Sequence, residues 1–545
     1  MERNNVTAFL SVAVSRVTIL AASLFITPLL FRILGAGDFG QWGAVMALFS
    51  LLMIFISAGI GGGARKFLSE NREDPLWEEH VFAFYFRLAG ALAVVAAIAL
   101  VVAARSGLVA SMFGPEYASY FYLLAILAIV AQYRAYVRLS LMGMKLETLA
   151  EPLRVTRKVL FGVFAVGLAW LGYGVKGVIV GEIIASASVI LFGTIFLLRH
   201  ISLSYIVRPL PSEFPRWELF AFNHNSIAYH FMMTSLVHVD VIMLGYFLAD
   251  SPEVGIYKGA LVIVQLLWIL PRSVQSVMVQ AVSDHWANDR VEKINAIAQR
   301  VVRYTTLLSI LLSLGLAALA WDFVPLYLGQ EGASAVWPLL LLIPGTLSYA
   351  IGRPVFAISY AKDDMRVLII ATGIAAGLNV VLNAVLIPMY GIYGAAVATT
   401  IGYTTLPLTH VWGAHELGYE PFGDFRPVRI LATTLIGAVP IAALSLLISN
   451  SYVALAVVPP VGLIGFGLAT FLTGAMHLEE IVDLLDSLPS PADRVADFLE
   501  PYAAENESGL ELLRTVLRES SRALVLVVAL VLVTLGMGLV GVVAL

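Results

Sequence analysis

The stretch that decides the fold is Gly114-Pro115-Glu116-Tyr117-Ala118-Ser119, because it returns later in the chain as Gly329-Gln330-Glu331-Gly332-Ala333-Ser334. The offset from Gly114 to Gly329 is 215 positions, and the same offset carries Phe39-Gly40-Gln41-Trp42 onto Val254-Gly255-Ile256-Tyr257. A period this long far exceeds the roughly 20 to 50 residues of solenoid and propeller repeats. It has the length of a repeated half of a membrane transport protein. The sequence therefore predicts that the membrane-embedded part was built twice.

Further positions obey the same repeat. Arg138 falls on Arg353 at the same offset, and residues 171–177 fall on residues 388–394 when two inserted residues are allowed. A chance match of one hexapeptide would not extend to these separate points. Because six spans are predicted in each copy, both copies begin on the same side of the membrane. We expect two pseudo-symmetric six-helix bundles in a parallel repeat, with additional C-terminal transmembrane helices.

The composition predicts an all-α polytopic membrane protein. The chain has 545 residues, of which 60% are hydrophobic and 13% are charged, so most of it requires an apolar environment. The formal net charge of -4 is small and gives nucleic-acid binding no electrostatic support. The absence of cysteine excludes disulfides, thiolate metal sites and cysteine nucleophiles. We expect no metal and no cofactor.

Runs of about 20 apolar residues, the length of a membrane-crossing helix, predict fourteen spans and then a fifteenth at 523–545. With the N-terminus in the cytoplasm, about 23 Lys and Arg lie in inner segments and about 4 in outer ones, as the positive-inside rule requires. The predicted organisation is an N-terminal six-helix bundle (1–200), a cytoplasmic linker (201–219), a C-terminal six-helix bundle (220–415), transmembrane helices 13 and 14 (416–475), a cytoplasmic acidic amphipathic segment (476–522) and a terminal transmembrane helix (523–545). The acidic segment is predicted to lie against the inner membrane face, or alternatively to bind a partner or regulate the protein.

Arginines inside the predicted spans are the strongest functional signal, since each costs about 2.5–3.5 kcal/mol at a helix centre. They are Arg16, Arg87, Arg134, Arg138, Arg272 and Arg353. Arg87, Arg138 and Arg353 are near the inner ends of their spans and favour snorkelling toward headgroups. Arg16, Arg134 and Arg272 are deeper and favour a water-filled cavity between the two halves.

The residue type and spacing point to an anionic ligand. Arg134 and Arg138 are four residues apart and share one helix face, while Arg353 is the repeat-mate of Arg138. Arginine, rather than lysine, binds phosphate oxygens in bidentate fashion and stays charged in a poorly hydrated site. We expect Arg16, Arg134 and Arg272 to bind a phosphate-bearing substrate, and Arg138 and Arg353 to recruit it.

Two other residues are candidates for conformational or coupling roles. Pro271 directly precedes Arg272, so it is expected to kink the eighth span beside a charge, either as a gate or as a simple packing kink. Asp240, in the seventh span, is a candidate for binding a coupling proton or sodium ion. The alternative for Asp240 is an interhelical hydrogen bond or a helix-end contact.

An enzyme is not expected. The predicted outer loops are about ten residues or fewer and leave no room for a catalytic domain, and no G-x-x-x-x-G-K-[ST] loop is present. Two rivals to the transport of a phosphate-bearing substrate remain open. One is a multidrug or metabolite exporter, whose cationic substrates would need a cavity lined by carboxylates. The other is a membrane glycosyltransferase or polysaccharide polymerase.

Several motifs resemble one family. They are Arg32-Ile33-Leu34-Gly35 with Asp38-Phe39-Gly40, Val239-Asp240-Val241-Ile242-Met243-Leu244-Gly245, Val254-Gly255-Ile256-Tyr257, and the pattern N-x-x-x-N-x-x-x-I-P-x-Y-G-I-x-G-A-A-x-A-T over residues 379–399. Over residues 1–475 the chain resembles the polysaccharide-transporter (oligosaccharide flippase) branch of the multidrug/oligosaccharidyl-lipid/polysaccharide (MOP) exporter superfamily. Val279-Gln280 stands where relatives often have a proline, and the acidic segment and the fifteenth span are outside the usual pattern.

The resemblance implies a function in cell-surface polysaccharide or glycoprotein assembly at the plasma membrane. It implies flipping of a polyprenyl-diphosphate-linked oligosaccharide from the inner to the outer leaflet by alternating access, with the lipid-linked oligosaccharide and the lipid bilayer as partners. Polysaccharide-assembly enzymes are further candidate partners. In the family, cationic residues on the first and eighth spans bind the diphosphate, and Arg16 and Arg272 occupy those spans here. Spans thirteen and fourteen resemble the pair that forms a lipid-tail groove in lipid II flippases.

Overall fold

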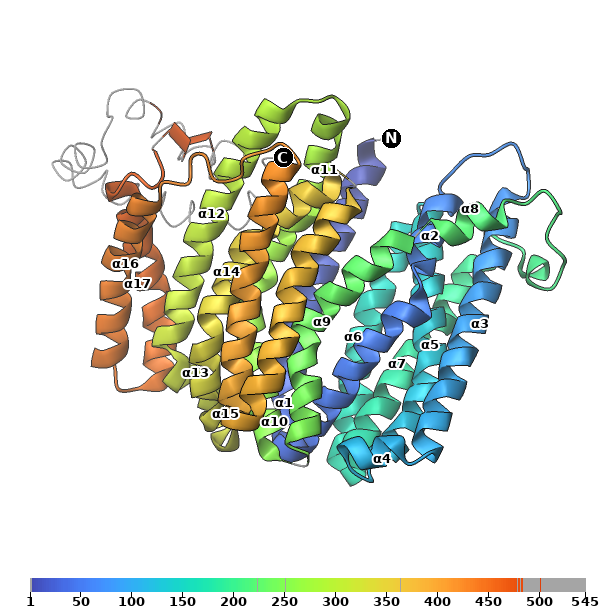
Figure 1. Cartoon of the computed structure of the whole chain (residues 1–545), viewed down its shortest axis with the longest axis horizontal. Coiled ribbons are helices and arrows are strands. Elements are labelled where there is room, and N and C mark those ends of the chain that lie inside the picture. The colour runs from blue at the N-terminus through green and yellow to red at the C-terminus, as the bar shows by residue number, and fades with distance from the viewer. Residues whose placement is uncertain are drawn as a thin grey trace. The chain divides into compact units, whose positions relative to one another are not determined.

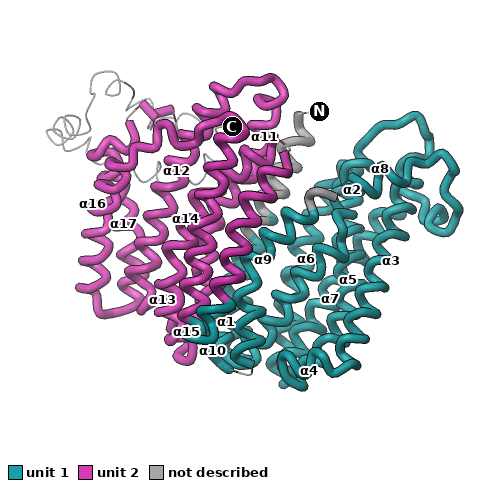
Figure 2. Tube along the Cα trace, viewed as in Figure 1, with its two compact units in different colours: residues 1–259, 384–392 teal, residues 260–383, 393–545 magenta. Residues whose placement is uncertain are grey.

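The computed structural model describes residues 2–222, 224–249, 251–362, 364–477, 479–480, 482–483 and 500. The chain forms two compact units, of which unit 1 comprises Met1–Gly259 and Ala384–Ile392, and unit 2 comprises Ala260–Asn383 and Tyr393–Leu545 (Figure 2). The predicted terminal helix at 523–545 and most of the predicted acidic segment at 476–522 lie outside the described residues. The domain boundaries that the repeat predicts stay predictions.

Both units are built from helices (Figure 1). Those that begin in unit 1 are α1 (Glu2–Ser57), α2 (Ile60–Leu68), α3 (Trp77–Arg105), α4 (Leu108–Phe113), α5 (Tyr117–Gly143), α6 (Glu147–Leu168), η1 (Ala169–Tyr173), α7 (Gly174–Leu197), η2 (Leu203–Ile206), α8 (Arg216–Ala221), α9 (His224–Phe247) and α10 (Pro252–Val264). Those that begin in unit 2 are η3 (Gln265–Trp268), α11 (Ile269–Ala287), α12 (Val291–Ala318), α13 (Ala320–Leu328), η4 (Gln330–Ala335), α14 (Val336–Ala361), α15 (Met365–Glu416), α16 (Pro427–Leu447) and α17 (Ser451–Leu472).

The described residues include eleven helices that are long and apolar enough to cross a membrane. Three of them, Thr18–Ser57, Glu147–Leu197 and Met365–Glu416, are 40, 51 and 52 residues long, which is enough for two crossings each. If these three count twice, the described chain makes fourteen crossings, the number that the sequence predicts before residue 475. The protein is therefore a multi-pass, all-α membrane protein, as predicted.

Glycines interrupt the double-length helices, and two of these glycines are repeat-mates. Gly174 has φ 52° and ψ -140°, and Gly391 has φ 56° and ψ -133°. This region of backbone space is essentially closed to residues with a Cβ. The sequence repeat aligns these two positions, and the structure gives them the same rare conformation.

The first glycine of the repeated hexapeptide ends a short helix in both copies. Gly114 ends α4 with φ 110° and ψ 158°, and Gly329 ends α13 with φ 93° and ψ 177°. In each copy a short helix stops at the glycine. The chain then enters α5 after a brief turn in the first copy, and enters α14 through the 3-10 helix η4 in the second. The prediction of a twice-built, all-α membrane protein is confirmed.

Within unit 1, the repeat-mates Gly40 and Gly255 pack directly against each other. A Cβ on Gly40 would lie 2.6 Å from the backbone nitrogen of Gly255. A Cβ on Gly255 would lie 1.8 Å from the carbonyl oxygen of Ala36. Small residues allow helix backbones to approach this closely in membranes, so the two glycines are required by the crossing of α1 and α10.

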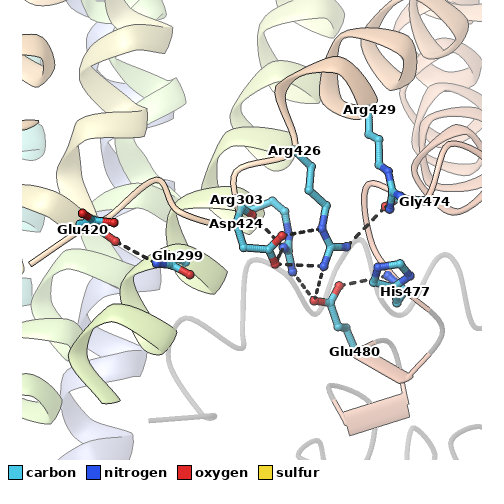
Figure 3. Close-up of polar contacts among 9 residues, drawn as sticks. All are labelled: Gln299, Arg303, Glu420, Asp424, Arg426, Arg429, Gly474, His477 and Glu480. Atoms are coloured by element: carbon cyan, nitrogen blue, oxygen red, sulfur yellow. Dashed lines mark hydrogen bonds and ion pairs between the residues drawn. The ribbon is translucent and has the colours of Figure 1, made fainter. Parts of the chain in front are cut away.

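A polar network joins the last helix pair to the rest of unit 2, where α16 and α17 both pack against α12. Arg303 of α12, whose side chain is only 1% exposed, forms ion pairs with Asp424, in the loop before α16, and with Glu480, after α17. Arg426 also donates to Asp424, at 2.8 and 2.9 Å. Figure 3 shows both carboxylates converging on the two guanidinium groups. The network joins the segment that precedes α16 and the segment that follows α17 to α12.

The Asp424 ion pairs make stability dependent on pH. Partial burial raises the pKa of Asp424, but the hydrogen bonds from Arg426 and Arg303 outweigh it, and its pKa lies below the ordinary value of 3.8. A lowered carboxylate pKa adds stability that is present above the unfolded pKa and lost as pH falls through the folded pKa.

We therefore expect Asp424→Asn to cost at most about 1 kcal/mol at neutral pH, because the carboxylate is half exposed and screened by solvent. The difference between variant and wild type should be complete above about pH 4 and be lost as the pH falls further, through the lowered pKa of Asp424. Thermal unfolding of both proteins in detergent at neutral and acidic pH checks this expectation. An equal difference at both pH values would contradict it.

Candidate anion-binding site

Three mutually packed helices of unit 1, α5, α6 and α7, bring charged side chains together inside the candidate membrane spans Tyr117–Gly143 and Glu147–Leu197. We call this group the basic cluster. Its members are Arg134, Arg138, Glu151, Arg154, Arg157, Lys158 and Glu182. Among these described side chains five are cationic and two are carboxylates, which leaves an excess of three positive charges. Charged side chains within membrane-spanning segments are costly and are candidates for functional sites.

Glu151 neutralises one side of the basic cluster. Its side chain is 3% exposed. The carboxylate forms an ion pair with Arg154 at 2.9 Å and another with Arg138 at 3.5 Å. Arg138 Nη1 also lies 3.2 Å from the sulfur of Met142. Arg138, predicted to recruit an anion, is thus shared with an internal carboxylate and remains partly exposed.

Glu182 neutralises the other side. Its Oε1 lies 2.7 Å from Arg157 Nη1, and the Ser186 hydroxyl donates to the same oxygen at 3.2 Å. The Arg157 side chain is 30% exposed whereas that of Glu182 is 12% exposed. The more accessible member of the pair is therefore the guanidinium.

Arg134 lies beside both groups, and in the described part of the chain no carboxylate pairs with it within ion-pair distance. Its Nε is buried and has no hydrogen-bond partner there. The charges that act on it are Arg157, Glu182 and Arg138. A buried N–H without an acceptor is costly, and a phosphate oxygen would supply the missing acceptor. Among the described side chains of the basic cluster, Arg134 is therefore a candidate for binding an anion.

Two predicted arginines belong to unit 2, where they lie over aromatic rings. Arg353 is 6% exposed, donates to Gln275 Oε1 at 2.6 Å, and places its guanidinium 4.7 Å from the ring centroid of Tyr349. Arg272 is exposed and lies 5.1 Å above the ring of Trp268. In the exposed Arg272, a cation–π contact of this kind leaves the edge of the guanidinium open to an anion.

Pro271 and Arg16 complete the predicted set. The chain changes from α-helix to 3-10 helix over Gln265–Trp268, one turn before the buried Pro271. Pro271 has no N–H to donate to the carbonyl of the preceding turn, and the change in helix type occurs at that turn. Arg16 belongs to α1, but its side chain lies outside the described part of the structure.

Asp240 is fully buried in unit 1 and accepts two hydrogen bonds. Tyr257 Oη donates at 2.5 Å to one oxygen, and the backbone N–H of Val241 donates at 2.7 Å to the other. Lys258 acts on it electrostatically. The alternative interpretation, an interhelical hydrogen bond, describes the Tyr257 contact, and a role for Asp240 in ion coupling stays a prediction.

Arg87 has a different surrounding from the other arginines. Its side chain donates to three carbonyl groups of the linker after α7, at Ile206 (2.7 Å), Tyr205 (3.1 Å) and Arg208. These contacts fasten the linker to α3. Its role in the structure is to anchor this segment.

The fold and the buried arginines together define an all-α, multi-pass membrane protein with the duplicated architecture of secondary transporters. A family model described as "Polysaccharide biosynthesis protein" matches residues 29–336, more than half of the chain. The chain belongs to this family. The predicted membership of the polysaccharide-transporter branch is thereby confirmed.

Individual relatives agree with this assignment. The chain is 28% identical over 183 residues to the probable low-salt glycan biosynthesis flippase Agl15 of Haloferax volcanii, covering 33% of this chain and 37% of the relative. It is 26% identical over 356 residues to the probable flippase AglR of the same organism, covering 58% and 71%. The solved structure of the lipid II flippase MurJ, in its inward closed conformation, matches with a TM-score of 0.65 at 16% identity, covering 85% of this chain and 98% of that one. This last likeness shows the fold.

Proposed function

We propose that this protein is a flippase that moves a polyprenyl-diphosphate-linked oligosaccharide from the inner to the outer leaflet by alternating access. The observation that carries the proposal is the excess of positive charge in the basic cluster, with Arg134 buried and short of an acceptor. A diphosphate supplies both the negative charge and the bidentate oxygen acceptors that guanidinium groups prefer. The names of the two Haloferax relatives, a probable glycan biosynthesis flippase and a probable flippase, support a flippase activity.

The arginines take the roles that the sequence predicts. Arg16, Arg134 and Arg272 hold the diphosphate, while Arg138 and Arg353 recruit it. Exposure supports this division for Arg272, whose side chain is exposed and forms no ion pair with a carboxylate among the described residues. Arg138 is shared with Glu151, which suits transient recruitment better than tight holding. Asp240 remains the candidate for a coupling ion, and Pro271 for a gate.

The proposed setting is the plasma membrane, with the N-terminus in the cytoplasm and the glycan used in cell-surface polysaccharide or glycoprotein assembly. The asymmetry of Lys and Arg between the predicted inner and outer segments supports the orientation. The multidrug alternative is less favoured, because a cationic drug would be repelled by the net positive basic cluster. No chemical step is assigned to the protein.

The experiment that tests the proposal is translocation by purified protein in vesicles. We expect wild-type protein to expose a fluorescent polyprenyl-diphosphate oligosaccharide on the far leaflet. Arg272→Ala should slow this about tenfold or more, since it removes a charge-assisted contact. Arg272→Lys should be intermediate, because lysine keeps the charge but loses the bidentate geometry.

Efflux of a soluble cationic dye from the same vesicles is the parallel measurement. Transport of the dye without exposure of the lipid-linked glycan would overturn the proposal in favour of an exporter. Undiminished exposure in Arg272→Ala would remove Arg272 from the proposed site.

A further inference from the structure

Glu182 is a carboxylate within a candidate membrane span, where a charged side chain costs free energy. It lies within α7, whose sequence has no other acidic residue, and its side chain is 12% exposed. The ion pair with Arg157 bridges α6 and α7 at 2.7 Å. A buried carboxylate of this kind requires a partner to stay charged. Arg157 is that partner.

The two members of the pair are held unequally. The Ser186 hydroxyl, one turn along α7, donates to the same Glu182 oxygen at 3.2 Å, so the carboxylate is fixed to its own helix. Arg157 has a longer and more exposed side chain, and the ion pair uses only its Nη1. The guanidinium can therefore turn to a second anion while Glu182 stays in place.

The surroundings favour such an exchange. Arg134 and Lys158 both act electrostatically on Glu182, as Arg157 does. A phosphate that enters this group can bind Arg157 through two parallel hydrogen bonds, where the carboxylate takes one. When the phosphate leaves, Glu182 restores a partner to Arg157, which would otherwise be a partly buried and uncompensated charge.

Glu151 differs from Glu182 in this respect. It is almost completely buried and is shared by Arg138 and Arg154. Its two partners come from different helices, so it holds α5 to α6 as well as neutralising charge. Glu182 pairs with a single arginine and is the carboxylate that a substrate can displace.

We propose that Glu182 is an internal counter-ion that binds Arg157 when the site is empty and releases it to a substrate phosphate group when the site is filled. The inference rests on the proposed function, because it assigns Glu182 a part in loading and release of the same diphosphate. By competing for Arg157, Glu182 lowers the affinity for the substrate and speeds the release of the substrate.

The test is a binding and transport comparison on the full-length protein in nanodiscs and vesicles, with a short-chain prenyl diphosphate as the binding probe. Glu182→Gln keeps the size of the side chain but removes its charge. We expect it to bind the probe about tenfold more tightly than wild type. Translocation of the lipid-linked oligosaccharide at saturating concentration should fall about tenfold, because release becomes slow.

Matched variants isolate the mechanism. Glu182→Asp keeps the charge and should bind like wild type, whereas Glu182→Ala is a second neutral variant that covers a failure of Glu182→Gln to fold. In the background of Arg157→Gln, the neutral change should bring no gain in affinity, since its partner is gone.

The outcomes distinguish the counter-ion role of Glu182 from the proposed flippase function. If wild type binds the probe and translocates, but the neutral variants bind no more tightly, the counter-ion role is overturned and the proposed function stands. A gain that persists in the Arg157→Gln background also overturns it. If wild type does not bind the prenyl diphosphate at all, the proposed function fails, and the role of Glu182 fails with it.

Discussion

Replacement of Arg134 by alanine is expected to lower the rate of lipid-linked oligosaccharide translocation by about ten- to a hundredfold. Arg134 has a buried Nε without a hydrogen-bond partner in the described part of the chain, and its electrostatic neighbours are two arginines and one glutamate. Its loss removes a cationic donor that has no competing hydrogen-bond acceptor at its Nε among the described residues. The measurement is exposure of a fluorescent lipid-linked oligosaccharide in vesicles that contain equal amounts of inserted protein.

The matched control for this prediction is Arg105→Ala. Arg105 is an exposed arginine at the end of α3 in the same unit and is outside the basic cluster. We expect this variant to translocate at the wild-type rate. If Arg105→Ala and Arg134→Ala slow translocation equally, the basic cluster is not the substrate site. A wild-type rate for Arg134→Ala would have the same meaning.

Replacement of Gly255 by alanine is expected to destabilise the protein by about 3 kcal/mol or more, at the upper end of overpacking effects. The new Cβ would lie 1.8 Å from the Ala36 carbonyl oxygen and 2.6 Å from its carbon, and both are backbone atoms that cannot turn aside. α1 and α10 would have to separate. The yield of folded protein and its melting temperature in detergent measure the effect.

Gly37→Ala serves as the control, because it makes the same chemical change one turn from the crossing. A Cβ on Gly37 would meet nothing within 4 Å. Alanine there is expected to be neutral or to stabilise the helix by up to about 1 kcal/mol. If the two variants melted at the same temperature, the close approach of Gly40 and Gly255 would not matter for stability.

The sequence predicts the architecture well because the repeat and the hydrophobic runs both depend on local physics. Gly114 and Gly329 share a backbone conformation that glycine alone adopts easily, so a duplicated glycine indicates a duplicated helix end. The pair Gly174 and Gly391 does the same for the breaks between spans. The compact units are less predictable, since the division after Gly259 falls inside α10 and depends on tertiary packing.

The basic cluster is only half predictable. The sequence singles out Arg134 and Arg138 but misses Arg154, Arg157 and Lys158. A predicted span that begins at 155 leaves Arg154 outside and puts Arg157 and Lys158 at its very start, where charges are common. In the structure α6 begins at Glu147 and runs through Pro152, which places Arg157 near the middle of the helix. The spacing of these three residues on one helix face, and a lone glutamate at 182, are the signals that identify the cluster.

The repeat also predicts which residue type occupies a position better than it predicts which side chains contact that residue. Arg138 and Arg353 are repeat-mates, yet Arg138 pairs with a carboxylate while Arg353 bonds an amide and lies over aromatic rings. Side-chain partners diverge after a duplication because they depend on neighbouring helices, whereas the backbone scaffold is retained.

The central claim is that these guanidinium groups recognise a diphosphate. Its most direct test is the affinity of the purified protein in nanodiscs for a prenyl diphosphate and for the matching uncharged prenyl alcohol. The account predicts that the diphosphate binds at least about tenfold more tightly than the alcohol, and that the double variant Arg134→Ala and Arg272→Ala abolishes this preference. Equal affinity of the wild-type protein for the two lipids would contradict it.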